Sequence, residues 1–313
     1  MPSLSVVVPV YESEQVLATL VARLEPVLRQ SSDTFELILV NDGSKDGSWR
    51  AIADLCTTHP WIRGIDLMRN SGQHNALLCG IRAARHDLII TLDDDLQNPP
   101  EEIPKMLDAL DESIDVVYGA PEREVHGLLR DLASQVTKIV MQGALGAETA
   151  RMIGPFRLFR TKIRRAFEDY RGTFVNIDVM LTWGATRFRA VRVRHDRRLA
   201  GQSSYTMGTL LTHTLNMLTG FSTLPLRVAS ALGFVCTVFG VVLLGYVLGR
   251  YAIYGVAVPG FAFLASIVII FSGTQLFTLG VIGEYLSRIH VRLLDRPAYV
   301  VREERDHTLS AVR

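Results

Sequence analysis

Short apolar runs alternate with segments of helical periodicity through the first 120 residues. The run Leu4–Val8 ends at Pro9, and the following segment places Val16, Leu17, Leu20 and later apolar residues at helical spacing. Such runs are typical of buried strands, and such spacing is typical of amphipathic helices. Strands are predicted at 4–8, 35–40, 62–67, 88–92 and 115–119, and helices at 11–28, 48–57, 73–84 and 101–110. Repeating units of about 30 residues predict an α/β domain with a mainly parallel sheet covered on both faces.

Two longer apolar segments lie near the C-terminal end. No residue is charged from Val228 to Gly249, and after Arg250 none is charged until Glu284. Each segment exceeds the roughly 20 residues with which a helix crosses a bilayer. We therefore predict two transmembrane helices, joined as a hairpin near Pro259. Two buried helices of a soluble domain are the alternative, which the length of the second uncharged segment disfavours.

Positive charges flank the predicted hairpin on both sides. Arg227 precedes it, and Arg288, Arg292 and Arg296 follow it. By the positive-inside rule both flanks, and with them the large N-terminal domain, are expected on the cytoplasmic side. The first residues show no basic flank or cleavage pattern, so we expect no signal peptide.

Composition narrows the range of partners. The 33 Lys and Arg residues nearly balance the 32 Asp and Glu residues, so no overall basic field favours a nucleic-acid partner. The three cysteines, Cys56, Cys79 and Cys236, have neither metal nor redox spacing, which fits a reducing compartment.

Polar clusters follow three of the predicted strands directly. They are Pro9 to Glu14, Asn41 to Ser44 and Asp93 to Gln97. Because ligands bind outside the carboxyl ends of parallel strands, we expect the three clusters to share one edge of the sheet. A nucleotide suits such an edge, yet neither of the glycine-rich phosphate-binding motifs is present. The phosphates are therefore expected to need a metal ion.

The run Asp93, Asp94 and Asp95 is the strongest candidate for that metal site. Three adjacent carboxylates repel one another unless a cation joins them, and oxygen ligands suit Mg²⁺ or Mn²⁺. A solvated acidic turn is the simpler interpretation, and the run alone does not decide between the two.

Four segments in order resemble the motifs of family 2 glycosyltransferases with the GT-A fold. They are VVVPVYESE, LVNDGSKDGS, RNSGQH and ITLDDDLQNPPEEIP. With the C-terminal hairpin, they resemble the branch that moves a sugar onto a polyprenyl phosphate. That branch includes dolichyl-phosphate mannose synthases, bactoprenol glucosyltransferases and the undecaprenyl-phosphate aminoarabinose transferases. The motifs of the last group resemble those of this sequence most. No QxxRW of the processive synthases is present, so transfer of a single sugar is favoured.

The resemblance implies a role for each matching residue. Asp93 and Asp95, with Gln97, would hold the divalent ion on a nucleotide diphosphate. Asp93, Asp95 and Arg198 would be the catalytic residues. A second group would surround the nucleotide, and a third would bind the lipid phosphate. The nucleotide group is Pro9, Tyr11, Glu14, Asp42, Asp93 and Asp94, and the lipid-phosphate group is Arg130, Ser134, Arg198 and Ser203.

The sequence departs from the family pattern at four places. Glu12-Ser13 replaces the usual Asn-Glu after Tyr11, and Asn41 stands where an Asp is common. Pro155 occupies the position of an Asp proposed as a base in some relatives, and Ser204 replaces a Lys. A phosphate monoester is largely dianionic at neutral pH, so such an acceptor does not require a strong base.

Helical spacing around Tyr205–Phe221 and Gly127–Gly143 predicts interfacial helices that bring a soluble donor to a membrane-bound acceptor. We expect a cytoplasmic catalytic domain at 1–204, an interfacial helix at 205–226, a transmembrane hairpin at 227–287 and a cytoplasmic tail at 288–313. The expected spans are about 228–249 and 261–283. By resemblance, the protein would be a multi-pass inner-membrane enzyme and a homo-oligomer, as a tetramer. Transfer to another lipid or glycan acceptor, or a non-catalytic membrane scaffold, are the competing hypotheses.

Overall fold

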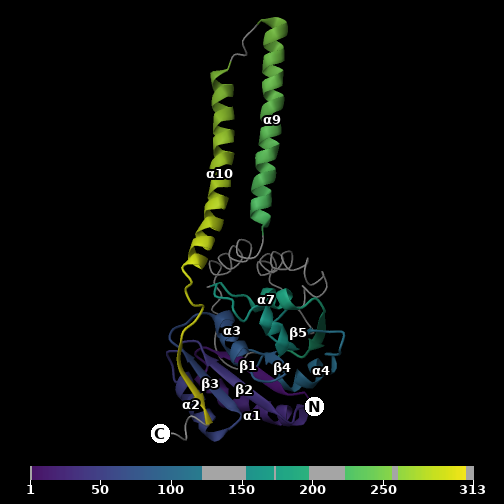
Figure 1. The fold of residues 1–313 in the computed structure, drawn as a ribbon, viewed down its shortest axis with the longest axis vertical. Helices are drawn as coiled ribbons and strands as arrows, with labels where there is room; N and C mark the ends of the chain where they lie inside the picture. The colour runs from purple at the N-terminus through teal and green to yellow at the C-terminus, as the bar shows by residue number, and fades with distance from the viewer. Residues whose placement is uncertain (1, 122–152, 173, 197–222, 256–259, 308–313) are drawn as a thin grey trace. The chain divides into compact units, whose positions relative to one another are not determined.

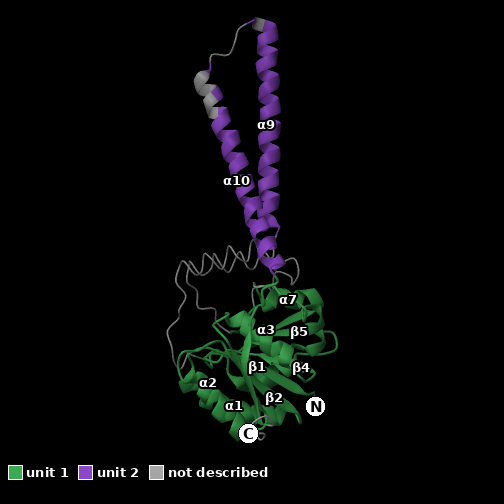
Figure 2. Cartoon of the chain, turned by 60° about the vertical axis from the view of Figure 1, so that its left-hand side comes forward, with its two compact units in different colours: residues 1–206, 295–313 green, residues 207–294 purple. Residues whose placement is uncertain are grey.

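The computed structural model describes residues 2–121, 153–172, 174–196, 223–255 and 260–307. The chain divides into two compact units, which are coloured separately in Figure 2. The first unit comprises residues 1–206 and 295–313, and the second comprises residues 207–294.

The first unit is built on an eight-stranded sheet with the order β7-β5-β6-β4-β1-β2-β3-β8 (Figure 1). Its centre, β4-β1-β2-β3, is parallel, and β6 and β8 run antiparallel to their neighbours. The mainly parallel sheet predicted from the sequence is therefore confirmed. The strands are β1 Leu4–Val10, β2 Phe35–Asn41, β3 Ile62–Leu67, β4 Leu88–Thr91, β5 Val116–Pro121, β6 Arg157–Arg160, β7 Phe188–Val193 and β8 Val301–Asp306.

Helices cover both faces of this sheet and create two hydrophobic cores. On β1, Val6 and Val8 belong to one core and Val7 to the other, as the alternation of side chains along a strand requires. All three side chains are completely buried, which explains the continuous apolar run in the sequence. The helices of this unit are α1 Glu14–Ser31, α2 Ser48–Thr58, α3 Gln73–Ala83, η1 Pro100–Glu102, α4 Ile103–Asp108, η2 Thr161–Ala166 and α7 Ile177–Gly184.

Two features differ from the sequence prediction. The helix expected at 101–110 is a short 3₁₀ turn followed by α4, because Pro104 lacks the N–H that a continuous helix would use there. The tail expected at 288–313 contains β8, which pairs antiparallel with β3 and belongs to the first unit.

The second unit contains the two apolar helices, α9 Leu224–Tyr254 and α10 Phe261–Leu293. Both are long and apolar enough to cross a membrane, with mean hydropathies of 2.4 and 1.6 over their candidate spans. Within the hairpin, Gly240 packs against the Phe271 ring, and Cys236 Sγ lies 3.7 Å from Thr274 Oγ1. The helices extend beyond the predicted spans, since helical backbone continues into their polar flanks.

Candidate functional site

The three polar clusters meet at the carboxyl ends of β4, β1 and β2, which are adjacent strands. The Tyr11 N–H, after β1, donates to Asp94 Oδ2 after β4 at 3.3 Å. The Glu12 N–H donates to Ser44 Oγ after β2 at 3.0 Å. The loop after the central strand therefore touches both of its neighbours, and the predicted convergence is confirmed.

Asp42 is held in place by a loop that follows β3. Its two carboxylate oxygens accept the N–H groups of Ser71 at 2.7 Å and Gly72 at 2.9 Å. Burial raises the pKa of Asp42, and the two backbone hydrogen bonds oppose that rise. The carboxylate is thus fixed in orientation at the sheet edge.

Gly43 allows the two loops to approach so closely. Its φ is +65°, and a Cβ there would lie 2.4 Å from the Asn70 backbone nitrogen. A side chain would meet backbone that cannot move aside without shifting the loop that holds Asp42. The NDG sequence is therefore a packing requirement of this site.

The aspartate run forms a tight turn after β4. Leu96 has a φ of +56° and is buried, while the Asp95 carboxylate accepts the Gln97 N–H at 3.1 Å. Burial raises the pKa of Asp94, and the charge of Asp95 adds to the rise. Three half-buried carboxylates in one turn create a local negative potential that favours a cation.

A divalent cation fits this donor set in part. In the described residues, no three His, Cys, Asp or Glu side chains converge into a complete metal cage. Mg²⁺ is commonly bound by one or two carboxylates together with substrate phosphates, so a complete cage is not required. Asp93, Asp95 and Gln97, all on one turn, supply oxygen ligands of the right kind.

The remaining predicted nucleotide residues have different surroundings. Pro9 is part of β1, paired in register with Val40, and Tyr11 is 44% exposed at the rim. Glu14 instead accepts the Gly47 N–H at 3.1 Å and links the starts of α1 and α2. Its carboxylate is engaged in this local contact, so its proposed role toward a nucleotide stays a prediction.

Gln73 is a site residue that the sequence analysis missed. At the start of α3, its side-chain amide donates to Asp93 Oδ1 at 2.6 Å. The neighbouring His74 accepts the Ile177 N–H at 3.3 Å, which is a local packing contact with the start of α7. The RNSGQH motif was the available signal, because its position after β3 places Gln73 at the same sheet edge.

A buried ion pair lies beneath the aspartate turn. Arg157 on β6 donates to both oxygens of Asp178 on α7, at 2.6 and 2.8 Å. The same guanidinium donates to Thr91 at 3.3 Å and to the Pro155 carbonyl at 3.1 Å. Thr91 ends β4, so this pair connects the base of the aspartate turn to α7.

The predicted lipid-phosphate residues Arg130, Ser134, Arg198 and Ser203 lie outside the described residues, as do the predicted interfacial segment 127–143 and residues 205–222 of the other. The last three residues expected in that interfacial helix, 224–226, belong to α9 instead. One anchor near them is described. The Asp196 N–H donates to the Gln97 carbonyl at 2.9 Å, two residues before Arg198 in the sequence. Asp196, the last residue described before Arg198, therefore lies beside the aspartate turn.

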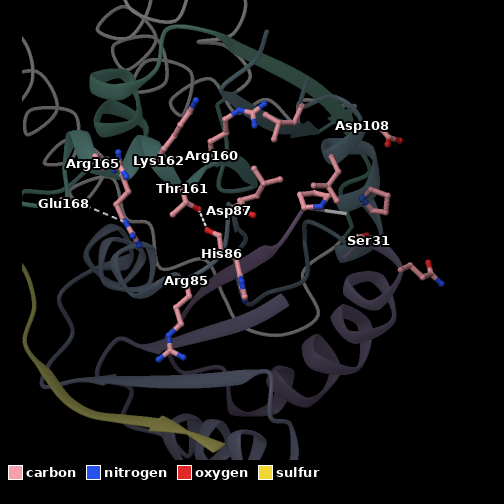
Figure 3. A pocket seen from close by; sticks show the side chains of 17 residues that line it. Ser31, Arg85, His86, Asp87, Asp108, Arg160, Thr161, Lys162, Arg165 and Glu168 are labelled. Atoms are coloured by element: carbon pink, nitrogen blue, oxygen red, sulfur yellow. Dashed lines mark hydrogen bonds and ion pairs between the residues drawn. The ribbon is translucent and has the colours of Figure 1, made fainter. Parts of the chain in front are cut away.

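A cleft of about 1090 Å³ lies elsewhere on the first unit (Figure 3). Its lining includes Pro2 and Leu88, at the amino ends of β1 and β4, and the cationic Arg160, Lys162 and Arg165. It occupies the opposite edge of the sheet from the three polar loops. Of the predicted site residues that the structure describes, none lines it.

The fold and the carboxylate-rich sheet edge define the class of protein. Residues 5–170 match the sequence profile described as glycosyl transferase family 2. The chain therefore belongs to this family and is a glycosyltransferase with a GT-A fold.

Similarity to curated proteins extends over nearly the whole chain. An undecaprenyl-phosphate 4-deoxy-4-formamido-L-arabinose transferase of Shewanella sediminis is 35% identical over 305 residues, covering 96% of this chain and 91% of that protein. The protein of the same name from Aeromonas hydrophila is 34% identical over 308 residues, covering 96% and 93%.

A solved structure supports the fold. Glucosyl-3-phosphoglycerate synthase from Mycobacterium tuberculosis, in complex with Mn²⁺ and uridine-diphosphate-glucose, has a TM-score of 0.51 and 15% identity. The match covers 70% of this chain and 78% of that one. At this identity the similarity establishes the GT-A fold of the first unit.

Proposed function

We propose that this glycosyltransferase moves a single sugar from a nucleotide-diphosphate sugar, of the UDP-sugar class, to undecaprenyl phosphate or a related polyprenyl phosphate. The observation that carries the proposal is the meeting of the Asp42 and Asp93–Asp95 loops at one edge of the sheet, in a chain with an apolar helical hairpin. The names of the curated relatives support the same acceptor class.

The donor would lie across the carboxyl ends of β2, β1 and β4. Asp42, with Pro9 and Tyr11 nearby, would contact the nucleoside, and the aspartate turn would face the diphosphate. Gln73 holds one oxygen of Asp93 through its amide, which restricts the rotation of that carboxylate. Such preorganisation lowers the cost of ordering the site when the donor binds.

Mg²⁺ or Mn²⁺ would be held by Asp93, Asp95 and Gln97 together with the diphosphate oxygens. When bound, a divalent ion stabilises the negative charge that grows on the departing nucleoside diphosphate. In support, a structural neighbour of this fold was solved with Mn²⁺ and a UDP-sugar.

The acceptor chemistry fits the absence of a carboxylate at position 155. The Pro155 carbonyl instead accepts hydrogen bonds from Thr91 and Arg157. Because a phosphate monoester is already largely dianionic at neutral pH, it attacks C1 without a strong general base. The acceptor phosphate needs a positively charged binding site that aligns its oxygen with the anomeric carbon. This is the role proposed for Arg198, together with Arg130, Ser134 and Ser203. Direct displacement at C1 gives inversion.

The apolar hairpin would hold the catalytic domain at the membrane, where the lipid acceptor lies. We infer that α9 and α10 span the inner membrane as a hairpin, with the catalytic domain and both termini in the cytoplasm. The arginines that flank the hairpin favour this orientation. A homo-oligomer, as a tetramer, stays a prediction from the family.

The test is lipid glycosylation by the purified protein in detergent, with undecaprenyl phosphate and a panel of nucleotide sugars, with and without EDTA. We expect one donor to yield a lipid-linked sugar in an EDTA-sensitive reaction. Transfer to a soluble acceptor in place of the lipid phosphate would reject the proposed acceptor. A product that persists in EDTA would reject the metal requirement.

A further inference from the structure

The strand β8 completes the sheet on the side of the proposed nucleotide site. It begins at Val301, eight residues after α10 ends at Leu293, and pairs antiparallel with β3 (Figure 1). Its partner strand leads directly into the loop that holds Asp42. The chain that leaves the apolar hairpin is therefore built into the donor side of the catalytic domain.

One side chain on β8 contacts β3 and the residue that follows it. Arg302 donates to Asp66 Oδ2 at 3.1 Å and to the Met68 carbonyl at 2.8 Å. Asp66 is 1% exposed, and its other oxygen accepts the Asn41 side-chain amide at 2.7 Å. Since Asn41 immediately precedes Asp42, hydrogen bonds connect Arg302 to the end of β2.

The Asn41 amide explains one departure from the family pattern. Its Nδ2 donates to Asp66, whereas a carboxylate at position 41 would place two negative charges together in a buried position. Asp66 thus receives one neutral and one charged donor. Loss of the charged donor would leave a buried carboxylate incompletely satisfied.

A second connection runs through the backbone. The Met68 N–H donates to the Val300 carbonyl at 2.9 Å, just before β8. Three and four residues later, the Ser71 and Gly72 N–H groups hold Asp42. The segment around Arg302 therefore fixes both the strand end that carries Asp42 and the loop that orients its carboxylate.

We propose that Arg302 is a positioning residue for the donor nucleotide. It does not itself touch the donor, but it sets the placement of Asp42 through Asp66 and Met68. This proposal rests on the donor binding beside Asp42, as proposed above.

The experiment is a calorimetric titration of UDP with Mn²⁺ into the full-length protein in detergent, followed by steady-state kinetics. We expect Arg302→Met to weaken UDP binding about tenfold, as befits the loss of a charged hydrogen bond. The KM for the donor should rise accordingly, and the KM for the lipid phosphate should stay unchanged. Arg305→Met is the matched control on the same strand, because Arg305 is 41% exposed and forms an ion pair with Glu303 of that strand.

A double variant separates positioning from general damage to the fold. Asp66→Asn combined with Arg302→Met removes the buried charge together with its partner, so UDP binding should recover relative to Arg302→Met alone. Failure to recover would overturn the route through Asp66. If Arg302→Met gives little folded protein, Arg302→Lys keeps the charge but loses the paired donors, and an intermediate UDP affinity is expected.

The outcomes for the two proposals are distinguishable. Wild-type protein that does not bind UDP with Mn²⁺ contradicts the proposed donor class. Wild-type binding with an unchanged affinity in Arg302→Met overturns the positioning role and leaves the proposed function intact. An equal loss in Arg305→Met would likewise overturn it.

Discussion

Carboxylates of the same chemical type are used in three different ways in this domain. Asp42 has both oxygens occupied by backbone N–H groups, and Asp178 has both occupied by one guanidinium. Asp95 is half-buried on a turn and accepts a hydrogen bond from the Gln97 backbone. The aspartate turn differs from both because it gathers three half-buried carboxylates, whose combined negative charge favours a bound cation.

Asp95→Asn should therefore abolish turnover without unfolding the protein. The amide retains the size of the side chain but loses the charge that a divalent ion requires. We expect kcat to fall by roughly 100-fold or more, as for loss of a major electrostatic contact in the transition state. Asp108→Asn, at the exposed end of α4, is the control. Full activity of Asp95→Asn, measured at saturating metal, would reject the metal assignment.

Asp178→Asn, by contrast, should act on stability. Burial alone raises the pKa of Asp178, but the charge and hydrogen bonds of Arg157 outweigh burial and hold that pKa below its usual value. The substitution leaves a buried guanidinium without a counter-charge, which costs about 3–5 kcal/mol. Asp115→Asn breaks a more exposed pair with Arg187, and about 1 kcal/mol or less is expected there.

The same pair predicts a pH dependence. An acid whose pKa is lower in the folded state binds fewer protons there, so its stabilisation is present above the unfolded pKa of about 4. It is lost as the pH falls through the lower, folded-state pKa. Thermal unfolding from pH 7 to pH 3 should show a smaller pH-dependent loss in Asp178→Asn than in the wild type. Identical profiles would show that this pair does not contribute.

At the scale of elements, periodicity predicted the first strands and helices because the apolar pattern of each lies within its own sequence. β1 and β2 are continuous apolar runs, and α1 has apolar residues at helical spacing. β8 has no such pattern, since its sequence VREERD is mostly charged, and its edge position against β3 is a tertiary outcome. Gln73 was missed for a similar reason, because its contact with Asp93 joins residues 20 positions apart.

The packing of the apolar hairpin can be tested by a crosslink. Cys236 Sγ lies 3.7 Å from Thr274 Oγ1, so Thr274→Cys should bring two sulfur atoms within reach of a disulfide. Cys56 and Cys79 are buried in the catalytic domain and should not compete. After mild oxidation, cleavage of the loop between α9 and α10 should leave the fragments joined until reduction. Leu276→Cys is the control, because the Leu276 side chain is 70% exposed. A similar crosslink from position 276 would contradict the register between α9 and α10.

At the scale of the whole molecule, the order of elements along the chain links catalysis to the membrane. The chain leaves the catalytic domain, forms α9 and α10, and returns to place β8 beside β3. Both ends of the hairpin thus connect to one domain, so both flanks would lie on the same side of a membrane that the hairpin crosses. One polypeptide can then bind both a soluble donor and a lipid acceptor, provided that separate residues contact each of the two substrates.

Separate contacts predict separate kinetic effects. Arg198→Ala should remove a charge-assisted hydrogen bond to the lipid phosphate, raising its KM about tenfold. The donor KM should change much less, because Asp42 and the aspartate turn are untouched. Arg189→Ala is the control, since its guanidinium is held by Asp111 and the Ala109 carbonyl. A rise in the donor KM with an unchanged lipid KM would place Arg198 on the nucleotide diphosphate, and the lipid-phosphate seat would have to be sought elsewhere in the chain.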